Sequence, residues 1–272
     1  MQKIQHYGIK EFAKTESAND NYAEDIIING FTILPDVVSK DLLPTIRDKV
    51  DRVYETQSKE IARCGDLTEI NDANIGRALL AYDEIFLNLA TQPIFLDLVK
   101  RLLGDYFILQ MQNAIINLPN QNNYQISWHR DLNYQHFTSS RPLAISILVC
   151  IDDFTPETGG TCVLPSSHKI EAFPSEQFIK NNEKNIAAEA GSALIMDSML
   201  FHRAGYNSST NVRRGINHMY CLPFIKQQIS FPAILNGKYA DDAFLNKFLG
   251  YDSEPGRSVT EWRARKFEKN KL

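Results

Sequence analysis

A tripeptide with the residue types of a metal site stands near the middle of the chain, His129-Arg130-Asp131. On an extended backbone, side chains two residues apart point to the same side, so an imidazole nitrogen and a carboxylate oxygen can meet at one point. A second histidine from a neighbouring strand would complete one face of an octahedron. The opposite three positions would then stay open, as in non-haem Fe(II) oxygenases. Alone, H-x-D also fits a surface turn, because these residue types are common.

The second histidine that fits best is His202, which follows the strand-like segment 191–197 after a short loop. Arg213 stands further along, just before the strand-like run 215–223. The planar guanidinium of an arginine in a pocket can bind a carboxylate through two hydrogen bonds. Together with the tripeptide, these residues predict three metal ligands and one anchor for a carboxylate.

Other histidines compete for these roles, and the register of the last strand stays open. His168 also follows the tripeptide and is the main competing ligand. Side chains alternate along a strand, so two registers are possible for the anchor. If Arg213 faces the pocket, Asn217 does too and His218 faces away. If Arg214 faces the pocket, His218 also faces it.

The first part of the chain has the periodicity of helices around one short strand. Residues 30–36 predict this strand, because a proline and an aspartate end its apolar run. Apolar residues at helical spacing predict helices within 42–54 and 83–103. We expect Ser39 or Asp41 to cap the first of these helices.

From residue 106 the pattern changes to short runs rich in Ile, Leu, Val and Tyr. Along 143–150 both alternating sets of side chains are mostly apolar, which favours a strand covered on both faces. Helices followed by many short strands predict a mainly β protein with flanking helices (α+β), an antiparallel barrel. Some runs also fit buried helix segments. The expected strands are 106–118, 142–151, 161–165, 191–197 and 215–222.

The composition disfavours several classes of protein. The chain of 272 residues has 29 Lys and Arg against 33 Asp and Glu, a formal net charge of −4, so nucleic acid is not the expected partner. The longest mostly apolar run, 143–151, is too short to span a membrane. The N-terminus lacks the apolar segment of a secretory signal, so we expect a soluble, cytoplasmic protein. Hydrolase-elbow, phosphate-loop and dinucleotide motifs are absent from the sequence.

Four motifs in order resemble the phytanoyl-CoA dioxygenase family of Fe(II)- and 2-oxoglutarate-dependent oxygenases. They are W-H-x-D (128–131), ETGGTCVLPSSH (157–168), LIMDSMLFHRAGYN (194–207) and the pair Arg213-Arg214. The resemblance is strongest over residues 106–223. It implies a double-stranded β-helix, which is a jelly-roll or cupin-like barrel, and the cofactors Fe(II), 2-oxoglutarate and O₂.

The resemblance also implies roles for individual residues. His129, Asp131 and His202 match the iron ligands of the family. Arg213 matches the basic residue that binds the distal carboxylate of 2-oxoglutarate.

Two further positions match residues that contact 2-oxoglutarate in the family, Thr161 and Asn117. His168 ends a turn that is structural in the family. The chain departs from the family pattern at Ala204, where many members carry a hydroxyl. Anchoring of 2-oxoglutarate is therefore expected to depend more on the arginine and the threonine.

Substrate contacts are expected from residues near the metal ligands. Leu132 lies beside the acidic ligand, Gln135 lies in the loop that follows it, and Asn217 lies on the anchor strand. We expect a single domain over 1–272, acting as a monomer or homodimer. Its parts are a barrel core over about 106–223, N-terminal helical support over 1–105 and a C-terminal lid or tail over 224–272.

These features predict an enzyme that hydroxylates an unactivated C–H bond of a small molecule, with release of succinate and CO₂. A natural product or an amino-acid-like metabolite is the favoured substrate. An acyl-CoA hydroxylase of the same family is an alternative, which the acidic chain disfavours. The alternative from another class is a metal-binding cupin-like barrel without turnover, acting as a binding module.

Overall fold

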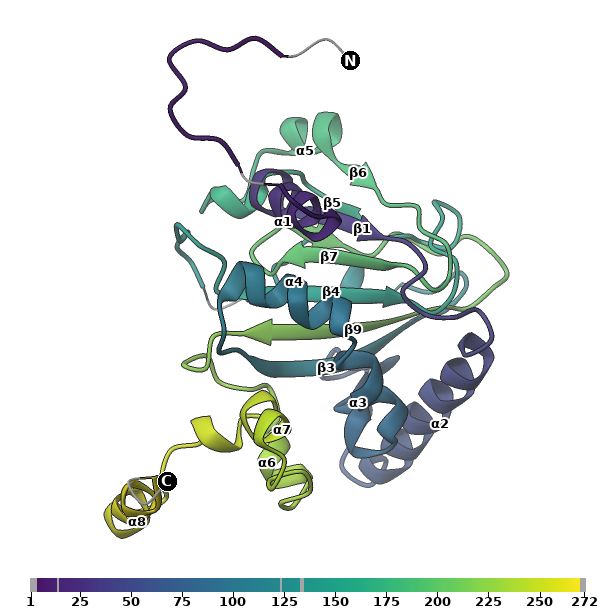
Figure 1. Ribbon diagram of the computed structural model, residues 1–272. Coiled ribbons are helices and arrows are strands. Elements are labelled where there is room, and N and C mark those ends of the chain that lie inside the picture. The colour runs from purple at the N-terminus through teal and green to yellow at the C-terminus, as the bar shows by residue number, and fades with distance from the viewer. Residues whose placement is uncertain (1–3, 14, 123, 133–134, 270–272) are drawn as a thin grey trace.

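Six antiparallel strands form the larger of two sheets (Figure 1). The computed structural model describes residues 4–13, 15–122, 124–132 and 135–269. The strand order is β1-β7-β4-β9-β3-β2, with β4, β9 and β7 near the centre. The strands are β1 (Phe31–Leu34), β2 (Ile75–Arg77), β3 (Ile108–Asn117), β4 (Ala144–Cys150), β7 (Ala193–Asp197) and β9 (Arg213–Cys221).

Three very short strands form the smaller sheet, in the order β6-β5-β8. They are β5 (Cys162–Val163), β6 (Lys184–Asn185) and β8 (His202–Arg203). The two sheets face one another as a jelly roll, which confirms the expected mainly β fold with flanking helices. They do not close into a barrel, so on this point the expectation of a barrel is corrected. Strands of two or three residues are too short to show an alternating pattern, which is why β2, β6 and β8 were not predicted.

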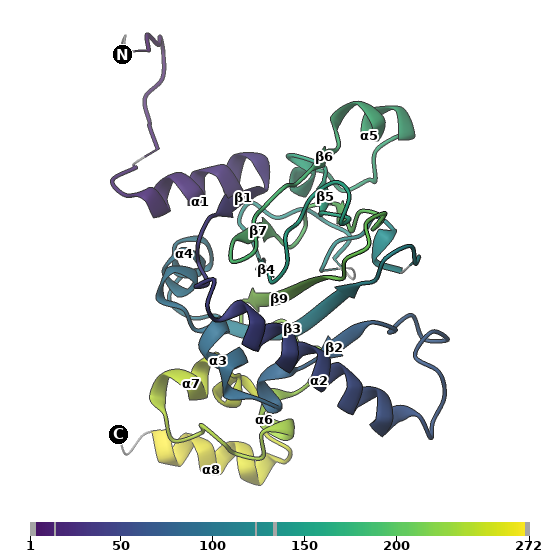
Figure 2. The ribbon, with the colours of Figure 1, turned by 90° about the vertical axis from the view of Figure 1, so that its right-hand side faces the viewer.

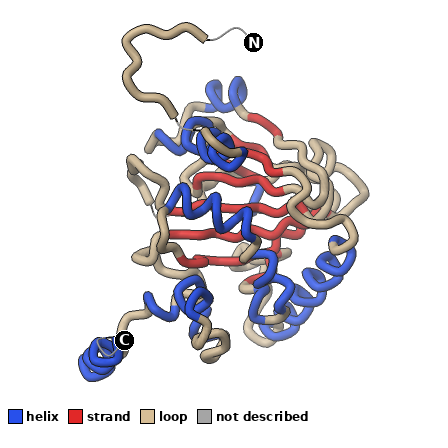
Figure 3. Tube along the Cα trace, viewed as in Figure 1, coloured by secondary structure: helices blue, strands red, loops and turns tan. Residues whose placement is uncertain are grey.

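The helices of the first 103 residues cover the face of the large sheet that points away from the small one, whereas α5 (Glu176–Asn182) lies beside the small sheet (Figures 1 and 2). Figure 3 shows the same arrangement by type of secondary structure. The helices are α1 (Ala18–Asn29), α2 (Leu43–Ile61), α3 (Glu84–Ala90), α4 (Pro93–Leu103), α5 (Glu176–Asn182), α6 (Phe231–Ile234), α7 (Ala243–Phe248) and α8 (Val259–Lys269). Short 3-10 turns are η1 (Leu79–Ala81), η2 (Tyr124–Ile126), η3 (Ser167–Lys169) and η4 (Tyr251–Ser253).

The central strand β4 is buried on both faces, as its sequence predicts. Ile147 and Val149 belong to the apolar cluster on the helix side, together with Phe95 of α4. Leu148 and Cys150 point the other way, into the cluster between the two sheets. Alternate residues of β4 therefore belong to two separate apolar clusters, one on each face of the sheet. A polar side chain on β4 must lie beside one of these clusters.

Helix α1 was not predicted, although the sequence marks both of its ends. Ser17 accepts a hydrogen bond from the Asp20 amide while the Asp20 side chain accepts from the Ser17 amide, a capping box. Gly30 ends the helix at a φ of 88°, and a Cβ there would lie 2.6 Å from Nδ1 of His168. The predicted cap of α2 by Ser39 or Asp41 is wrong, because no side chain caps its first residue.

The C-terminal segment packs beside strand β3 of the large sheet. Phe231 and Phe248 are buried, and the ring of Phe248 lies edge-on to that of Phe107, with centroids 6.4 Å apart. Helix α8 is more exposed, with Trp262 55% accessible. Within the described ranges, no helix is both long and apolar enough to cross a membrane.

Replacing Phe95 with alanine should destabilise the protein by about 3–5 kcal/mol, because the ring is fully buried between α4 and the sheet. Urea unfolding monitored by circular dichroism measures the change. The matched control is Phe224→Ala, since Phe224 is 73% exposed. That variant should stay within about 0.5 kcal/mol of the parent protein. Equal losses for the two variants would contradict the assignment of this core.

Candidate metal centre and the surrounding pocket

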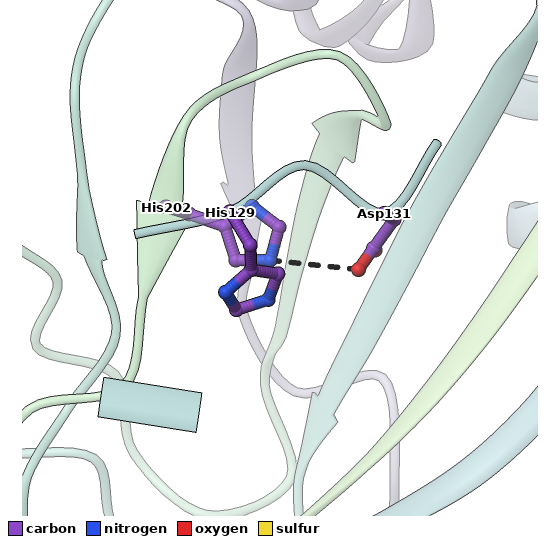
Figure 4. A group of neighbouring side chains, drawn as sticks. All are labelled: His129, Asp131 and His202. Atoms are coloured by element: carbon purple, nitrogen blue, oxygen red, sulfur yellow. Dashed lines mark ion pairs between the residues drawn. The ribbon is translucent and has the colours of Figure 1, made fainter. Parts of the chain in front are cut away.

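Two imidazoles and one carboxylate converge on the side of the jelly roll where the sheets meet (Figure 4). One potential ligand atom from each of His129, Asp131 and His202 lies within 4.8 Å of the others. Nε2 of His202 is 3.6 Å from Oδ1 of Asp131, and the two imidazole centroids are 4.3 Å apart. The structure therefore brings together the three residues that the sequence singles out.

Backbone hydrogen bonds hold these residues in place. The amides of His129 and His202 each donate to the carbonyl of the other at 3.0 Å, an antiparallel bridge. The amide of Asp131 donates to the carbonyl of Ser198 at 3.1 Å. The two histidines are therefore paired directly across this bridge, while the amide of Asp131 is bonded to the turn between β7 and β8.

Each histidine turns the same nitrogen toward the centre. Nδ1 of His129 lies 2.8 Å from the carbonyl of Ser127, and Nδ1 of His202 lies 3.0 Å from the carbonyl of Leu200. A carbonyl only accepts, so the proton belongs on Nδ1 and the Nε2 lone pair faces the centre. Burial, with a smaller effect of the adjacent His202, lowers the pKa of His129 to about 4, so this ring is neutral at pH 7.

The two oxygens of Asp131 have different surroundings. Oδ2 accepts hydrogen bonds from the Ser146 hydroxyl and from Nδ2 of Asn217, the latter at 3.0 Å, while Oδ1 faces His202. Burial acts to raise the pKa of Asp131. The two histidines and the two donors outweigh it and hold the pKa below its usual value. The carboxyl group is thus an anion at neutral pH.

This donor set fits a ferrous ion. Two neutral imidazole nitrogens and one carboxylate oxygen on one side of a pocket are the facial triad of non-haem iron oxygenases. The three donors come from a loop and a short strand that are joined by backbone hydrogen bonds, which hold the donors in this arrangement.

A small pocket lies next to the triad. Its walls combine apolar side chains of the large sheet with polar side chains from both sheets. The lining residues are Ile115, Gln125, His129, Asp131, Leu148, Thr161, Met196, His202, Arg203, Ala204, Arg213 and Asn217.

Arg213 brings a buried positive charge to this pocket. It is 2% exposed, its guanidinium donates to the carbonyl of Gly159 at 2.9 Å, and it stacks 4.4 Å from the ring of Phe154. Burial lowers its pKa to about 10, so it remains charged at pH 7. Among the described residues it forms no ion pair, and its Nε has no hydrogen-bond partner. A carboxylate that entered the pocket would meet this charge.

In the register of β9 that the structure shows, Arg213 faces the pocket and Arg214 does not. Arg214 points out of the pocket and forms ion pairs with Asp51 at 2.8 Å and with Asp152 at 3.0 Å. His218 lies on the helix-covered face, where its Nδ1 is 3.1 Å from Nε2 of the Gln112 side chain. Arg213 and Asn217 face the pocket together, as side-chain alternation requires.

The remaining predicted contact residues divide into two groups. Thr161 and Asn217 line the pocket. Asn117, Leu132 and Gln135 are not among the described residues that line it.

Each residue of the second group has other neighbours. The Asn117 amide donates to the carbonyl of Gly205 at 3.0 Å, and the Gln135 amide donates to that of Phe137 at 2.8 Å. Leu132 packs against a small apolar cluster at the end of β9. Asn117 is fully buried, and it lies opposite Arg213 in the pairing of β3 with β9.

Glycines allow the segment that carries Thr161 to approach β8. The amide of Gly205 donates to the carbonyl of Gly160 at 3.0 Å. A Cβ on Gly205 would lie 2.7 Å from that same oxygen, and Gly159 has a φ of 74° that side chains rarely adopt. The close contact also places the Gly159 carbonyl where Arg213 reaches it.

His168 lies outside the triad. Its Nε2 is 3.2 Å from the carbonyl of Ile27, and Gly30 packs against its ring. This histidine therefore joins η3 to the end of α1.

Sequence reasoning missed three residues that support the triad. Ser146 and Ser198 are fully buried and 2.8 Å apart, and Ser146 donates to Asp131. Arg130 donates to the carbonyl of Met199 at 2.8 Å and lies 3.8 Å above the ring of Phe201. A hydroxyl within the apolar run of β4 was the signal for Ser146. For Arg130 the signal was its place inside the tripeptide.

Comparison with known proteins agrees with this geometry. The family model of phytanoyl-CoA dioxygenase (PhyH) matches residues 28–215. The uncharacterized protein Rv1501 of Mycobacterium tuberculosis is 32% identical over 241 residues, which cover 86% of this chain and 87% of that protein. Dioxygenase af480 of Aspergillus fumigatus is 26% identical over 206 residues, covering 71% of this chain and 63% of that protein.

Among solved structures, EctD from S. alaskensis with 2-oxoglutarate and 5-hydroxyectoine has a similar fold. The TM-score is 0.65 at 18% identity, over 77% of this chain and 78% of that chain. The jelly roll and its triad define a non-haem iron oxygenase. The chain belongs to the phytanoyl-CoA dioxygenase family. It is a 2-oxoglutarate-dependent iron dioxygenase, and the expected cofactors of this class, iron and 2-oxoglutarate, are confirmed.

Acid should destabilise the fold through His218. Burial lowers its pKa from 6.5 to about 3, so the folded protein keeps the ring neutral where the unfolded chain protonates it. The unfolded state therefore binds more protons below pH 6.5, and stability falls as the pH drops from 6.5 toward 3. From about pH 7 to about pH 5, His218 alone should remove about 2 kcal/mol.

Urea unfolding of the parent protein and of His218→Gln at both pH values measures this contribution. The glutamine variant should lose about 2 kcal/mol less on acidification than the parent protein does. The same pH dependence in both proteins would contradict a buried neutral His218.

Proposed function

We propose that this enzyme holds ferrous iron through His129, Asp131 and His202 and oxidises an unactivated C–H bond of a small molecule. Hydroxylation with release of succinate and CO₂ is the proposed reaction. The observation that carries the proposal is that the three proposed ligands line the same pocket as Arg213, which forms no ion pair within the described part of the chain. A metal site alone would fit many proteins, whereas a buried cation beside it fits a dicarboxylate cosubstrate.

Arg213 is proposed to bind the distal carboxylate of 2-oxoglutarate. Its guanidinium is held by the Gly159 carbonyl and by the face of Phe154, so contacts within the chain set its orientation. A charge-assisted pair in such a water-poor site is stronger than one at the surface. Thr161 adds a hydroxyl to the lining of the same pocket, and we propose it as the second contact of 2-oxoglutarate.

Asn117 is proposed to act beside Arg213, since the two residues are paired across β3 and β9. Leu132, Gln135 and Asn217 are proposed to contact the substrate. Asn217 has the strongest support of these three, because it lines the pocket and contacts Asp131.

When bound, iron and 2-oxoglutarate supply the activation of O₂ and the oxidising equivalents. The chain supplies geometry. The His129 and His202 rings direct Nε2 toward the centre, because backbone carbonyls accept hydrogen bonds from Nδ1. The apolar side chains Ile115, Leu148 and Met196 of the large sheet also line the pocket and limit water there.

The favoured substrate is a small natural product or an amino-acid-like metabolite. The similar fold of the S. alaskensis protein, which was solved with 5-hydroxyectoine, supports this proposal.

The purified protein should form succinate when supplied with Fe(II), 2-oxoglutarate and O₂, even without its substrate. Asp131→Ala and His202→Ala should reduce this slow turnover to background, because each removes a proposed ligand. Chromatographic detection of succinate measures it. His136→Ala serves as control, since His136 is exposed and should leave the rate unchanged. Metal binding by the parent protein without any succinate would instead support a non-catalytic binding module.

Arg213→Ala should weaken 2-oxoglutarate binding by about 10- to 100-fold, the value of a lost hydrogen-bonded charge pair. Arg213→Lys should lose less, because it keeps the charge without the planar fork. Titration of the protein with 2-oxoglutarate in the presence of Fe(II) measures the affinity. Arg214→Ala is the matched control and should bind 2-oxoglutarate normally, since Arg214 faces two aspartates outside the pocket. A larger loss for Arg214→Ala would contradict the proposed anchor.

A further inference from the structure

We propose that Ser146 and Asn217 are positioning residues that hold one oxygen of Asp131, so that this carboxylate offers only its other oxygen to the metal. The proposal rests on the proposed function, in which Asp131 is an iron ligand. Beyond that function, this inference gives a reason why Asp131 would bind the metal through one oxygen atom.

The hydrogen bonds around Asp131 have only one possible direction. A carboxylate anion only accepts, so the Ser146 hydroxyl donates to Oδ2, and Nδ2 of Asn217 donates to the same oxygen at 3.0 Å. Ser146 has then used its proton, so its oxygen accepts from the Ser198 hydroxyl at 2.8 Å. The result is a directed chain from Ser198 through Ser146 to Asp131, in which each bond strengthens the next.

The two donors come from adjacent central strands of the large sheet. Ser146 of β4 pairs with Met219 of β9, and Asn217 lies two residues before Met219, so it points to the same face. Both side chains are buried, with Ser146 fully inaccessible and Asn217 7% exposed. Strands of this kind fix donor positions more firmly than a loop does. The sheet thereby sets the orientation of an acid that itself lies on a loop.

Binding through one oxygen matters because a metal ion has a limited number of coordination positions. An octahedral ion with three protein donors keeps three positions open, which suffice for a chelating cosubstrate and for O₂. A carboxylate that binds through both oxygens uses one of those positions. Oδ2 has two donors and Oδ1 has none among the described residues, so the acid is disposed to bind through Oδ1 alone.

Co(II) tests this proposal without dependence on turnover. Its visible absorption responds to coordination number, and titration of the whole protein gives its affinity. The variants are Ser146→Ala and Asn217→Ala, which remove one donor each, and Ser146→Thr, which keeps the hydroxyl. Thr32→Val is the matched control. Thr32 lies in β1 of the same sheet, and the change removes the hydrogen bond from its hydroxyl to the carboxylate of Asp25 in α1.

Ser146→Ala and Asn217→Ala should each weaken Co(II) binding by about 10- to 100-fold and change the visible spectrum. Ser146→Thr and Thr32→Val should bind Co(II) with the affinity and spectrum of the parent protein. Wild-type affinity and spectrum in both alanine variants would overturn the proposal. If Ser146→Ala does not fold, as judged by circular dichroism, Asn217→Ala decides alone by the same two outcomes.

His202→Ala separates failure of this inference from failure of the proposed function. If the parent protein binds Co(II), His202→Ala does not, and both donor variants match the parent, only the positioning role is overturned. If His202→Ala binds Co(II) like the parent protein, the metal site itself is wrong, and the positioning role is overturned with it.

Discussion

The pair of backbone hydrogen bonds between His129 and His202 is the contact on which the site depends. These residues belong to segments far apart in the chain, and the antiparallel bridge brings their Cα atoms opposite one another. Both side chains then leave the backbone at the same place, with their rings in contact. The glycines at 159, 160 and 205 extend this alignment to the neighbouring strand β5. A shift of one residue in this pairing would turn the histidines to opposite faces.

Much of the site was predictable because the spacing of two residues within a strand or strand-like segment determines whether their side chains point to the same face. His129 and Asp131 share a face for that reason, and Arg213 shares one with Asn217. The long strands β3, β4, β7 and β9 were also predicted from their apolar runs. Helix α1 was missed because its apolar residues do not form a regular stripe, although its capping box and Gly30 mark its ends.

Contacts between strands could not be predicted in the same way. Whether Arg213 or Arg214 faces the pocket depends on how β9 pairs with β4 and β3, and the sequence of β9 allows both registers. The role of Ser146 depends on the same pairing, since its partner Asp131 lies on a loop outside the sheet. Asn117 illustrates the opposite case. It lies on the predicted strand, yet its amide turns to the Gly205 carbonyl at the edge of the pocket.

The solitary charge of Arg213 has a thermodynamic consequence for the whole molecule. Folding removes this guanidinium from water, and among the described residues a carbonyl and an aromatic ring contact it in return. Neither neutralises its charge, so these contacts do not recover all of its hydration free energy. Binding of a dicarboxylate at this charge, as proposed above, would stabilise the folded state alone and shift the folding equilibrium by mass action. Under that proposal, the persistence of the enzyme and the supply of its cosubstrate are linked through one side chain.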